Sequence, residues 1–387
     1  MNRLQFWILI SIVAISGFSQ GMLLPLISII FEQDGISSTM NGLNATGLYI
    51  GILIISPFME YPLRKYGYKP IILLGGLLVI VSLAFFPLYK SFWFWFFLRL
   101  CIGIGDNALH FGTQTWITSS TLKEHRGRNI SLYGLFFGIG FAAGPLMTPL
   151  VTISESLPFI LSACMCLISW LFLFLLKNEK PVQDDTEEVA INSFKETASR
   201  FKTTLSFCWV ALLPALCYGF LEASLNGSFP IYGLRIGLDV SYISIALAAF
   251  AVGGVITQLP LGMLSDRIGR RRLLTYILFF GSLTFFAASF LESSALALTI
   301  CLLFAGMLVG STFSLGISYM TDVTPKSLLP TGNLLCGIAF SLGSLLGPYL
   351  GGVFIQVFTS ISFFVVIGSI LFMIFVIIST RKQEITY

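Results

Sequence analysis

Charged residues are scarce in this chain, and their scarcity excludes a soluble globular protein. Only 10% of the 387 residues are charged, whereas 56% are hydrophobic and the mean hydropathy is +0.90. A soluble chain of this length cannot bury so many apolar side chains, so lipid is expected to surround most of it. The net charge of +4 therefore does not indicate a nucleic-acid partner.

The sequence also lacks the residue clusters that carry most enzyme chemistry. It has 2 histidines, and its 7 cysteines all lie in apolar segments without zinc spacing, which predicts neither a metal site nor a disulfide framework. We find no phosphate-binding loop, haem motif or Ser/His/Asp arrangement. We therefore expect no cofactor, no enzymatic activity and no direct use of ATP.

The chain instead has long apolar runs, each able to cross a bilayer as a helix. The first is too long for a signal-peptide core and has no evident cleavage site, so we interpret it as a transmembrane helix. The sequence thus predicts an all-α membrane protein with 12 transmembrane helices. The runs lie at roughly 6–31, 39–63, 70–88, 92–120, 129–153, 156–177, 205–233, 241–264, 273–291, 295–321, 332–358 and 360–380.

One long polar stretch divides these spans into two groups of six. It predicts an N-terminal half (1–177), a solvated cytoplasmic linker (178–204) rather than a regulatory domain, and a C-terminal half (205–387). By our count, 19 of the 22 Lys and Arg residues fall in segments on the same side as the N-terminus. The positive-inside rule then places both termini in the cytoplasm. The composition fits a bacterial inner membrane.

The two halves repeat each other at a nearly constant offset, which indicates an internal duplication typical of secondary transporters. The paired features include a Gly-Pro step, which bends helices and lets them pack closely, so we assign it to helix packing. The pairs are Gly67 with Gly269, Gly144-Pro145 with Gly347-Pro348, Asn129 with Asn333, and Pro25 with Pro230.

Residues 262–272, Gly-Met-Leu-Ser-Asp-Arg-Ile-Gly-Arg-Arg-Arg, form a cationic turn between two apolar runs. The turn resembles the signature loop of the major facilitator superfamily. That resemblance implies two six-helix pseudo-repeats that move a solute by alternating access, with this loop as a conformational gate. The gate residues it implies are Asp266, Arg267, Gly269, Arg270 and Arg271.

The first-half copy of this loop departs from the family pattern. Arg64 stands where the aspartate should be, and Glu60 stands where the first glycine should be. Most members that use the loop as a latch carry the acid in the first half, so we expect Asp266 to take over that role. The Arg64–Gly67 departure and the Ser344–Pro348 run are most similar to the YcaD-like bacterial branch of the superfamily, which implies no particular substrate.

The Gly-Pro step of the fifth span resembles a family motif associated with antiporters. It reads Gly140-xxx-Gly144-Pro145, but Thr148-Pro149 replaces the terminal Gly-Gly of that motif. The resemblance therefore gives partial support to antiport.

The fourth span carries three ionisable residues, Arg99, Asp106 and His110. Spacings of seven and four place them on one helix stripe, and ionisable residues inside a span indicate function by default. We expect Asp106 and His110 to carry the proton, with Arg99 holding Asp106 ionised. Arg99, followed by glycines four and six residues later, resembles a family signature implicated in proton coupling. The alternative is an Arg–Asp pair that only fixes helix packing, with His110 bonded to backbone.

Glu222, on the seventh span, is the other acid expected to be buried. It is spaced by four residues from Tyr218 and from Asn226, so the three share a helix face. We expect Glu222 to bind substrate or a proton; the alternative is a cap beside a helix break near Pro230. Weaker candidates for the substrate cavity are Gln20, Ser311, Ser314 and Trp116.

These features predict a secondary active transporter for a small organic solute, with proton-coupled efflux by antiport favoured. Proton-coupled or facilitated uptake of a sugar, nucleoside or similar metabolite is the alternative within transport. A non-transporting membrane sensor or a lipid-handling protein is the alternative of another class. The expected partners are the substrate, protons and the lipid bilayer, and we expect a monomer.

Overall fold

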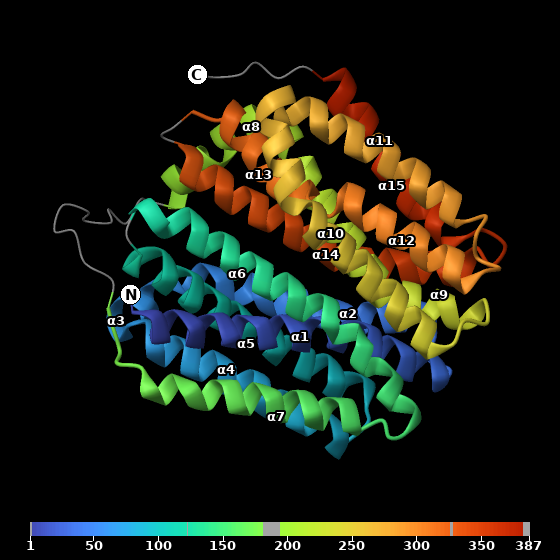
Figure 1. Cartoon of the computed structure of the whole chain (residues 1–387), viewed down its shortest axis with the longest axis horizontal. Coiled ribbons are helices and arrows are strands. Elements are labelled where there is room, and N and C mark those ends of the chain that lie inside the picture. Colours follow the sequence, from blue (N-terminus) through green and yellow to red (C-terminus); the bar gives the residue numbers. More distant parts are fainter. Residues whose placement is uncertain (1, 122, 181–193, 326–327, 382–387) are drawn as a thin grey trace.

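The computed structural model describes residues 2–121, 123–180, 194–325 and 328–381, and within them every regular element is a helix. Figure 1 shows two bundles of helices side by side, with the first half of the chain in one and the second half in the other. The first bundle contains α1 (Arg3–Gln33), α2 (Ser38–Ile55), η1 (Ser56–Phe58), α3 (Glu60–Tyr66), α4 (Tyr68–Phe85), η2 (Phe86–Leu88), α5 (Phe92–Ser120), α6 (Lys123–Ala143), η3 (Gly144–Thr152), α7 (Leu157–Leu171) and η4 (Phe172–Leu175).

The second bundle repeats this arrangement, with helix breaks at different positions. α8 begins inside the predicted linker, so residues 194–204 are helical, while linker residues 181–193 lie outside the described residues. The second bundle contains α8 (Phe194–Gly227), α9 (Phe229–Arg235), α10 (Val240–Ile268), α11 (Arg270–Ala288), α12 (Ala295–Val309), α13 (Thr312–Val323), α14 (Leu329–Val357) and α15 (Phe363–Thr380).

Among the described residues, 11 helices are long and apolar enough to cross a membrane. The predicted second span, α2, packs in the same bundle but has a polar first half. The Asn41 amide donates to the Ser28 carbonyl on α1 (2.9 Å), and the Asn44 amide donates to the Phe92 carbonyl at the start of α5 (2.9 Å). Because both side chains are buried and their amides bond within the bundle, α2 can carry them without exposing them to lipid.

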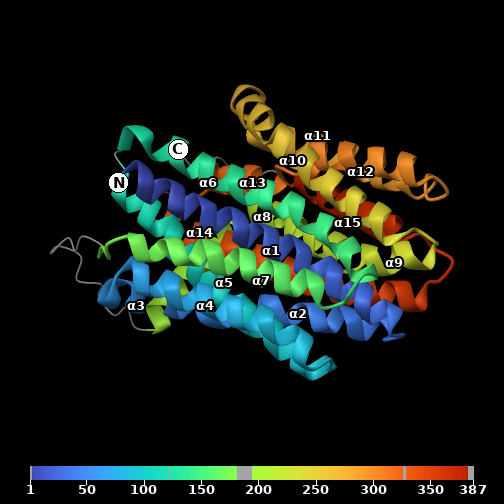
Figure 2. The same ribbon diagram turned by 60° about the horizontal axis from the view of Figure 1, so that its bottom comes forward.

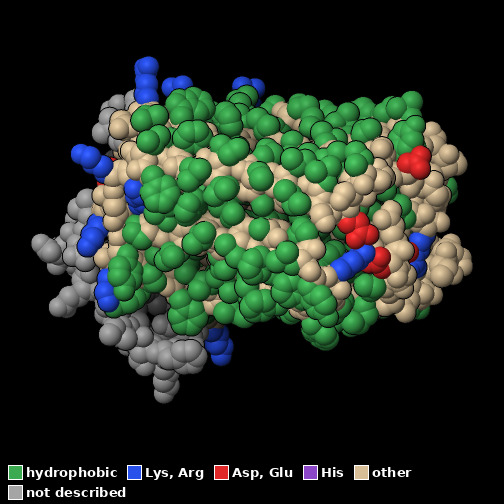
Figure 3. Space-filling model, turned by 90° about the horizontal axis from the view of Figure 1, so that it is seen from below, with side chains coloured by type: hydrophobic (Ala, Val, Ile, Leu, Met, Phe, Trp, Pro, Cys, Tyr) green, Lys and Arg blue, Asp and Glu red, His purple; other side chains and the backbone are tan. Residues whose placement is uncertain are grey.

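The two ends of the molecule differ in charge. Figures 1 and 2 agree that α3 and the start of α1 lie at one end, which we call the α3 end, and that α9 lies at the other, the α9 end. In Figure 3 hydrophobic side chains cover the middle of the visible face, and Lys and Arg predominate toward the α3 end. Exposed side chains such as Leu74 (66%) and Leu259 (71%) belong to the apolar surface that lipid would cover.

Equivalent glycines bring equivalent helices into close contact in the two halves. A Cβ added to Gly144 would lie 2.5 Å from the carbonyl oxygen of Phe18, on α1. A Cβ added to Gly347 would lie 2.6 Å from the carbonyl oxygen of Phe220, on α8. The glycines differ by 347 − 144 = 203 positions and their partners by 220 − 18 = 202, so the internal duplication extends to this packing.

A second repeated feature caps a helix at the α3 end of each half. Nζ of Lys69, at the start of α4, donates to the carbonyl of Leu176 (2.7 Å). Nη2 of Arg271, at the start of α11, donates to the carbonyl of Ile378, near the end of α15 (2.8 Å). The donors differ by 271 − 69 = 202 positions and the acceptors by 378 − 176 = 202. In each half a cation therefore satisfies free carbonyls at the end of the last span.

The halves meet along three helix contacts: α2 with α14, α10 with α6 and η3, and α1 with α8 and α9. The described polar contacts between halves gather toward the α9 end. There Arg235 pairs with Glu32 (2.7 Å), and the Thr39 hydroxyl donates to the Gln356 side chain (2.6 Å). The hydroxyls of Thr148 and Ser244 also bond each other. These contacts hold the halves together at the α9 end.

Candidate functional site

A cavity of about 410 Å³ lies between the two halves. The first half contributes residues from α1, α2, α6 and η3, and the second contributes residues from α8, α10, α13 and α14. Most of the wall is apolar and aromatic. Its polar side chains are few: Gln20 and Tyr49 from the first half, and Tyr218, Glu222, Asn226, Gln258 and Ser314 from the second.

Glu222 is the one acidic side chain among the described residues that line the cavity. The four-residue spacing on α8 places Tyr218, Glu222 and Asn226 on the same wall, and the Asn226 amide donates to the carbonyl of Glu222 (2.9 Å). The wall thus presents a carboxylate beside a phenol and an amide. Such a group can bind a cation or a proton.

Asp106 does not line this cavity. It is 2% exposed and lies behind the wall, where it lines a small cavity of about 20 Å³ together with residues of α1, α4 and α7. The Ser16 hydroxyl lies 2.9 Å from its Oδ1 atom, and its Oδ2 atom has no hydrogen-bond partner. Asp106 therefore reaches the central cavity only through its neighbours.

His110 connects Asp106 to the cavity wall. Its Nε2 atom lies 3.0 Å from the Ser16 hydroxyl and 3.1 Å from the Gln20 amide nitrogen, and Gln20 lines the cavity. Its Nδ1 atom lies 2.6 Å from the hydroxyl of Tyr133 on α6. Hydrogen bonds thus run from Asp106 through Ser16 and His110 to Gln20. The alternative in which His110 bonds only to backbone does not apply.

Arg99 forms no ion pair with Asp106, contrary to the expectation that it holds this acid ionised. Seven residues of helix separate them by about 10 Å along α5, beyond the reach of an ion pair. Arg99 is fully buried, and its Nη2 atom donates to the carbonyl of Leu23 (3.4 Å) while Nε and Nη1 have no partner. Tyr49, on the cavity wall, lies close enough to interact electrostatically with both Arg99 and Glu222.

Two residues expected in the cavity lie elsewhere. Trp116 is fully buried near the α3 end, where its Nε1 atom donates to Glu179 (2.7 Å) and its ring stacks on Tyr68. Ser311 sits at the break between α12 and α13, and the break turns it off the wall that Ser314 lines. A continuous helix, which the spacing assumes, would keep both serines on one side.

The cationic loop bonds within its own half. Arg270 lies 3.4 Å from Asp266 and 2.5 Å from Asp322 on α13, and it also donates to the carbonyl of Ser318 (2.9 Å). Arg267 is exposed, and Gly269 has a φ of +94°, which favours glycine at this sharp turn. Arg270 therefore ties the start of α11 to the end of α13.

Three polar residues near the cavity were absent from the sequence-based prediction: Tyr49, Gln258 and Tyr133. Gln258 lies in an apolar span, and an isolated amide in such a span is a signal that could have identified it. Tyr49 and Tyr133 carry no such signal, because tyrosine is common in apolar helices. No group of three or more His, Cys, Asp or Glu side chains in the described part of the chain is placed to hold a metal ion.

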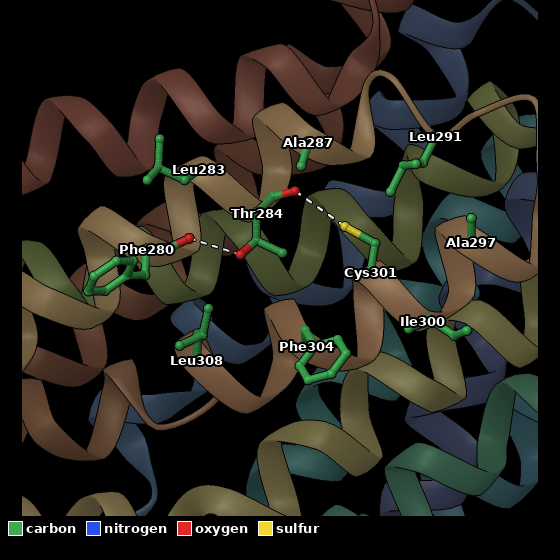
Figure 4. Close-up of a pocket in the computed structure, with 10 residues that line it drawn as sticks. All are labelled: Phe280, Leu283, Thr284, Ala287, Leu291, Ala297, Ile300, Cys301, Phe304 and Leu308. Carbon is green, nitrogen blue, oxygen red and sulfur yellow. Dashed lines mark hydrogen bonds between the residues drawn. The ribbon is translucent and has the colours of Figure 1, made fainter.

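A second hollow, of about 660 Å³, opens on the outer surface between α11 and α12. Figure 4 shows its lining side chains, including Phe280 and Phe304, with the Cys301 thiol directed at the carbonyl of Thr284 (3.3 Å). Both phenylalanines are about half exposed. The hollow has no charged side chain, so it offers no group for binding an ion or a proton.

Comparisons with known proteins agree on one family. The family model described as Major Facilitator Superfamily matches residues 9–241 and 211–384. The uncharacterized MFS-type transporter YfkF of Bacillus subtilis (strain 168) is 57% identical over 364 residues, 94% of this chain and 92% of that relative. The uncharacterized MFS-type transporter YcaD of Shigella flexneri is 21% identical over 353 residues, 90% of this chain and 88% of that relative.

The fold also matches a solved structure. It is the crystal structure of a bacterial homolog to the human lysosomal transporter Spinster, in an inward-facing and unoccupied conformation. The TM-score is 0.73, with 18% sequence identity, and the match covers 91% of this chain and 83% of that one. At this identity the likeness concerns the fold alone.

Proposed function

The chain belongs to the major facilitator superfamily and is thus a multi-pass secondary transporter, and from that premise we propose that it exports a small organic cation in exchange for protons. The observation that carries the proposal is Glu222, a lone carboxylate on the wall of the cavity between the halves. A solute in this cavity is in contact with both halves, as alternating access requires.

A carboxylate on an apolar wall favours a partner that neutralises it. An ionised carboxylate with little water around it is costly, and either a bound proton or a bound cation removes that cost. The two cannot occupy Glu222 together, so binding of one displaces the other. Competition of this kind exchanges a proton for a cationic solute and requires no second binding group.

The wall favours a solute with apolar surface beside its charge. Aromatic side chains from both halves line the cavity, among them Phe141 from α6 and Phe250 from α10. Aromatic faces attract cations and also bury apolar surface. A volume of about 410 Å³ lies in the usual range for small-molecule sites. An amphipathic organic cation fits both properties.

The contacts between the halves indicate from which end of the molecule the solute would enter the cavity. The described polar contacts at the α9 end hold the halves together there, so solute would enter the cavity from the α3 end in this conformation. We take the α3 end, rich in Lys and Arg, to face the cytoplasm of a bacterial inner membrane. The protein would then collect its solute from the cytoplasm.

Binding of tetraphenylphosphonium, an apolar organic cation, to the purified protein tests the proposal. A ligand that binds the folded state raises the melting temperature. We expect such a rise at pH 8, a smaller one at pH 5.5, where protons compete, and none in Glu222→Gln. Glu155→Gln, which changes an exposed acid outside the cavity, serves as the matched control and should behave as wild type.

Transport in proteoliposomes separates efflux from uptake. An imposed pH gradient should drive tetraphenylphosphonium against the proton flux, and release of protons should accompany its binding. No binding of this cation, together with stabilisation by a sugar or nucleoside, would reject the proposal in favour of uptake. Binding that persists in Glu222→Gln would reject Glu222 as the shared site.

A further inference from the structure

Three side chains, those of Ser16, His110 and Gln20, connect Asp106 to the cavity through hydrogen-bond distances, and the hydrogens available to them restrict how they bond. The Ser16 hydroxyl has one hydrogen but faces two acceptors, Oδ1 of Asp106 (2.9 Å) and Nε2 of His110 (3.0 Å). Both contacts are satisfied only if one of these neighbours supplies a hydrogen of its own. Either Asp106 is protonated, or His110 carries its hydrogen on Nε2.

Each case fixes the other bonds in the cluster. When Asp106 is ionised, Ser16 donates to it, Nε2–H of His110 donates to Ser16, and the Tyr133 hydroxyl donates to Nδ1. When Asp106 is protonated, it donates to Ser16, Ser16 donates to Nε2, and Nδ1–H donates to Tyr133. The two cases therefore contain opposite tautomers of His110.

The tautomer determines which atom of Gln20 faces His110. The amide nitrogen of Gln20 lies 3.1 Å from Nε2, and Gln20 also lines the cavity. If Nε2 carries hydrogen, the amide oxygen turns toward it and the NH₂ group turns to the cavity. If Nε2 has a free lone pair, the NH₂ group turns toward it and the oxygen turns to the cavity.

We propose that Asp106 is a second proton-binding site, remote from the substrate, whose charge sets whether Gln20 presents a hydrogen-bond donor or an acceptor to the cavity. Asp106, Ser16, His110 and Tyr133 are positioning residues in this scheme, and Gln20 determines specificity. The inference rests on the proposed function for its role in the transport cycle, because a proton bound at Asp106 affects transport only if the protein exchanges its solute for protons.

The proton transfers balance. A proton moves from the Tyr133 hydroxyl to Nδ1, another from Nε2 to the Ser16 oxygen, and a third from Ser16 to Oδ1 of Asp106. Tyr133 then takes up one proton from the solution. It is only partly buried and lies one helical turn from Phe137, which lines the cavity. The net result is one proton added at Asp106 and one exchange of tautomer at His110.

Few other titratable groups face Asp106. Of the elements packed around it, α5 contributes His110, α6 contributes Tyr133 and α7 contributes Cys166. The described lining residues of α1 and α4 at this site carry no titratable side chain. The first proton taken up here therefore belongs to Asp106 or to His110, and the two differ in a measurable way.

Nitrogen NMR of ¹⁵N-histidine-labelled full-length protein in lipid nanodiscs distinguishes them. The chain has 2 histidines, so His125→Gln leaves the signals of His110 alone. Between pH 9 and pH 5 we expect the hydrogen to move completely from Nε2 to Nδ1, with no imidazolium. Asp106→Asn should remove the pH dependence, and Ser16→Ala should prevent the exchange.

Ser28→Ala is the matched control, because Ser28 is a buried serine of α1 whose hydroxyl has no partner. It should titrate as wild type. Formation of imidazolium at His110, or an exchange that survives Ser16→Ala, would overturn the inference. Glu222→Gln should leave the tautomer exchange at His110 intact. The binding assay can therefore reject the proposed function while this inference stands, and the NMR experiment can reject this inference while the proposed function stands.

Discussion

The guanidinium of Arg235 lies 2.7 Å from the carboxylate of Glu32, and this ion pair joins the two halves of the chain at the α9 end. Glu32 belongs to the last turn of α1, and Arg235 is the last residue of α9. The pair exists only while the halves are together at this end. It should therefore favour the conformation in which the cavity is closed there.

Loss of this ion pair should shift the protein toward the conformation open at the α9 end. Glu32→Gln or Arg235→Gln should each cost that closure about 1 kcal/mol at most, since the Arg235 side chain is 37% exposed and salt screens the pair. The population would change up to about fivefold. The double variant Glu32→Arg/Arg235→Glu should restore most of the closure.

A disulfide between introduced cysteines can report this closure. Thr148 and Ser244 bond each other across the halves, so Thr148→Cys/Ser244→Cys should cross-link under mild oxidation when the end is closed. The yield should fall in Arg235→Gln and recover in the reversed pair. Equal yields in all three backgrounds would show that the ion pair does not stabilise closure.

Helix contacts at the repeated Gly-Pro steps should not tolerate a methyl group. Gly347→Ala would bring Cβ to 2.6 Å from the carbonyl of Phe220, and such overpacking typically costs about 1–3 kcal/mol. Gly337→Ala, on the same helix, meets nothing within 4 Å and should be neutral or slightly stabilising. Thermal unfolding in detergent compares them, and equal melting temperatures would contradict the packing assignment.

The sequence allowed prediction of the fold because its strongest signals act along the chain. Apolar length identifies spans, and the constant offset between Gly67 and Gly269 identifies the duplication, which the caps of Lys69 and Arg271 reproduce in three dimensions. α2 shows the limit of hydropathy: the amide nitrogens of Asn41 and Asn44, in its polar first half, donate to α1 and α5, and a hydropathy window along the chain does not include these contacts.

The site was predictable only where helix periodicity determines it. Four-residue spacing on one unbroken helix correctly placed Tyr218, Glu222 and Asn226 together. The same reasoning grouped Arg99 with Asp106, but seven residues of helix place them about 10 Å apart, and a shared stripe does not bring them into contact. The connection of Asp106 to Gln20 depends on contacts between α1 and α5, and Trp116 bonds to Glu179, which follows the sixth span. No pattern within one segment of the sequence indicates either contact.

The conformational gate expected at the cationic loop (residues 262–272), and with it the rate of transport, should depend on Asp322 more than on Asp266. Arg270 lies closer to Asp322 (2.5 Å against 3.4 Å), and Asp266 is the more exposed acid (69% against 39%). We expect Asp322→Asn to slow transport in proteoliposomes by an amount on the order of 1 kcal/mol, about fivefold, and Asp266→Asn to have little effect. A larger loss in Asp266→Asn would instead support the latch role that the family resemblance implies.

Lys90 should stabilise the protein at neutral pH, and this contribution should be lost in alkaline solution. It lies between α4 and α5 and bonds to Asp34 (2.7 Å) and Glu155 (2.8 Å). Partial burial lowers the pKa of Lys90, but the hydrogen bonds to the two carboxylates raise it by more, so the pKa lies above its usual 10.5. A pKa raised on folding adds stability that is fully present below pH 10.5 and is lost as the pH rises through the folded value.

The Lys90 side chain is 36% exposed, so its contribution to stability should stay below about 1 kcal/mol. The melting temperature of wild type should therefore fall more steeply between pH 10 and pH 12 than that of Lys90→Met. Lys65→Met, which removes an exposed lysine whose described contacts are with tyrosine rings, controls for the loss of a charge. If Lys90→Met and wild type lose stability in parallel over this range, the two carboxylates do not stabilise the charged lysine.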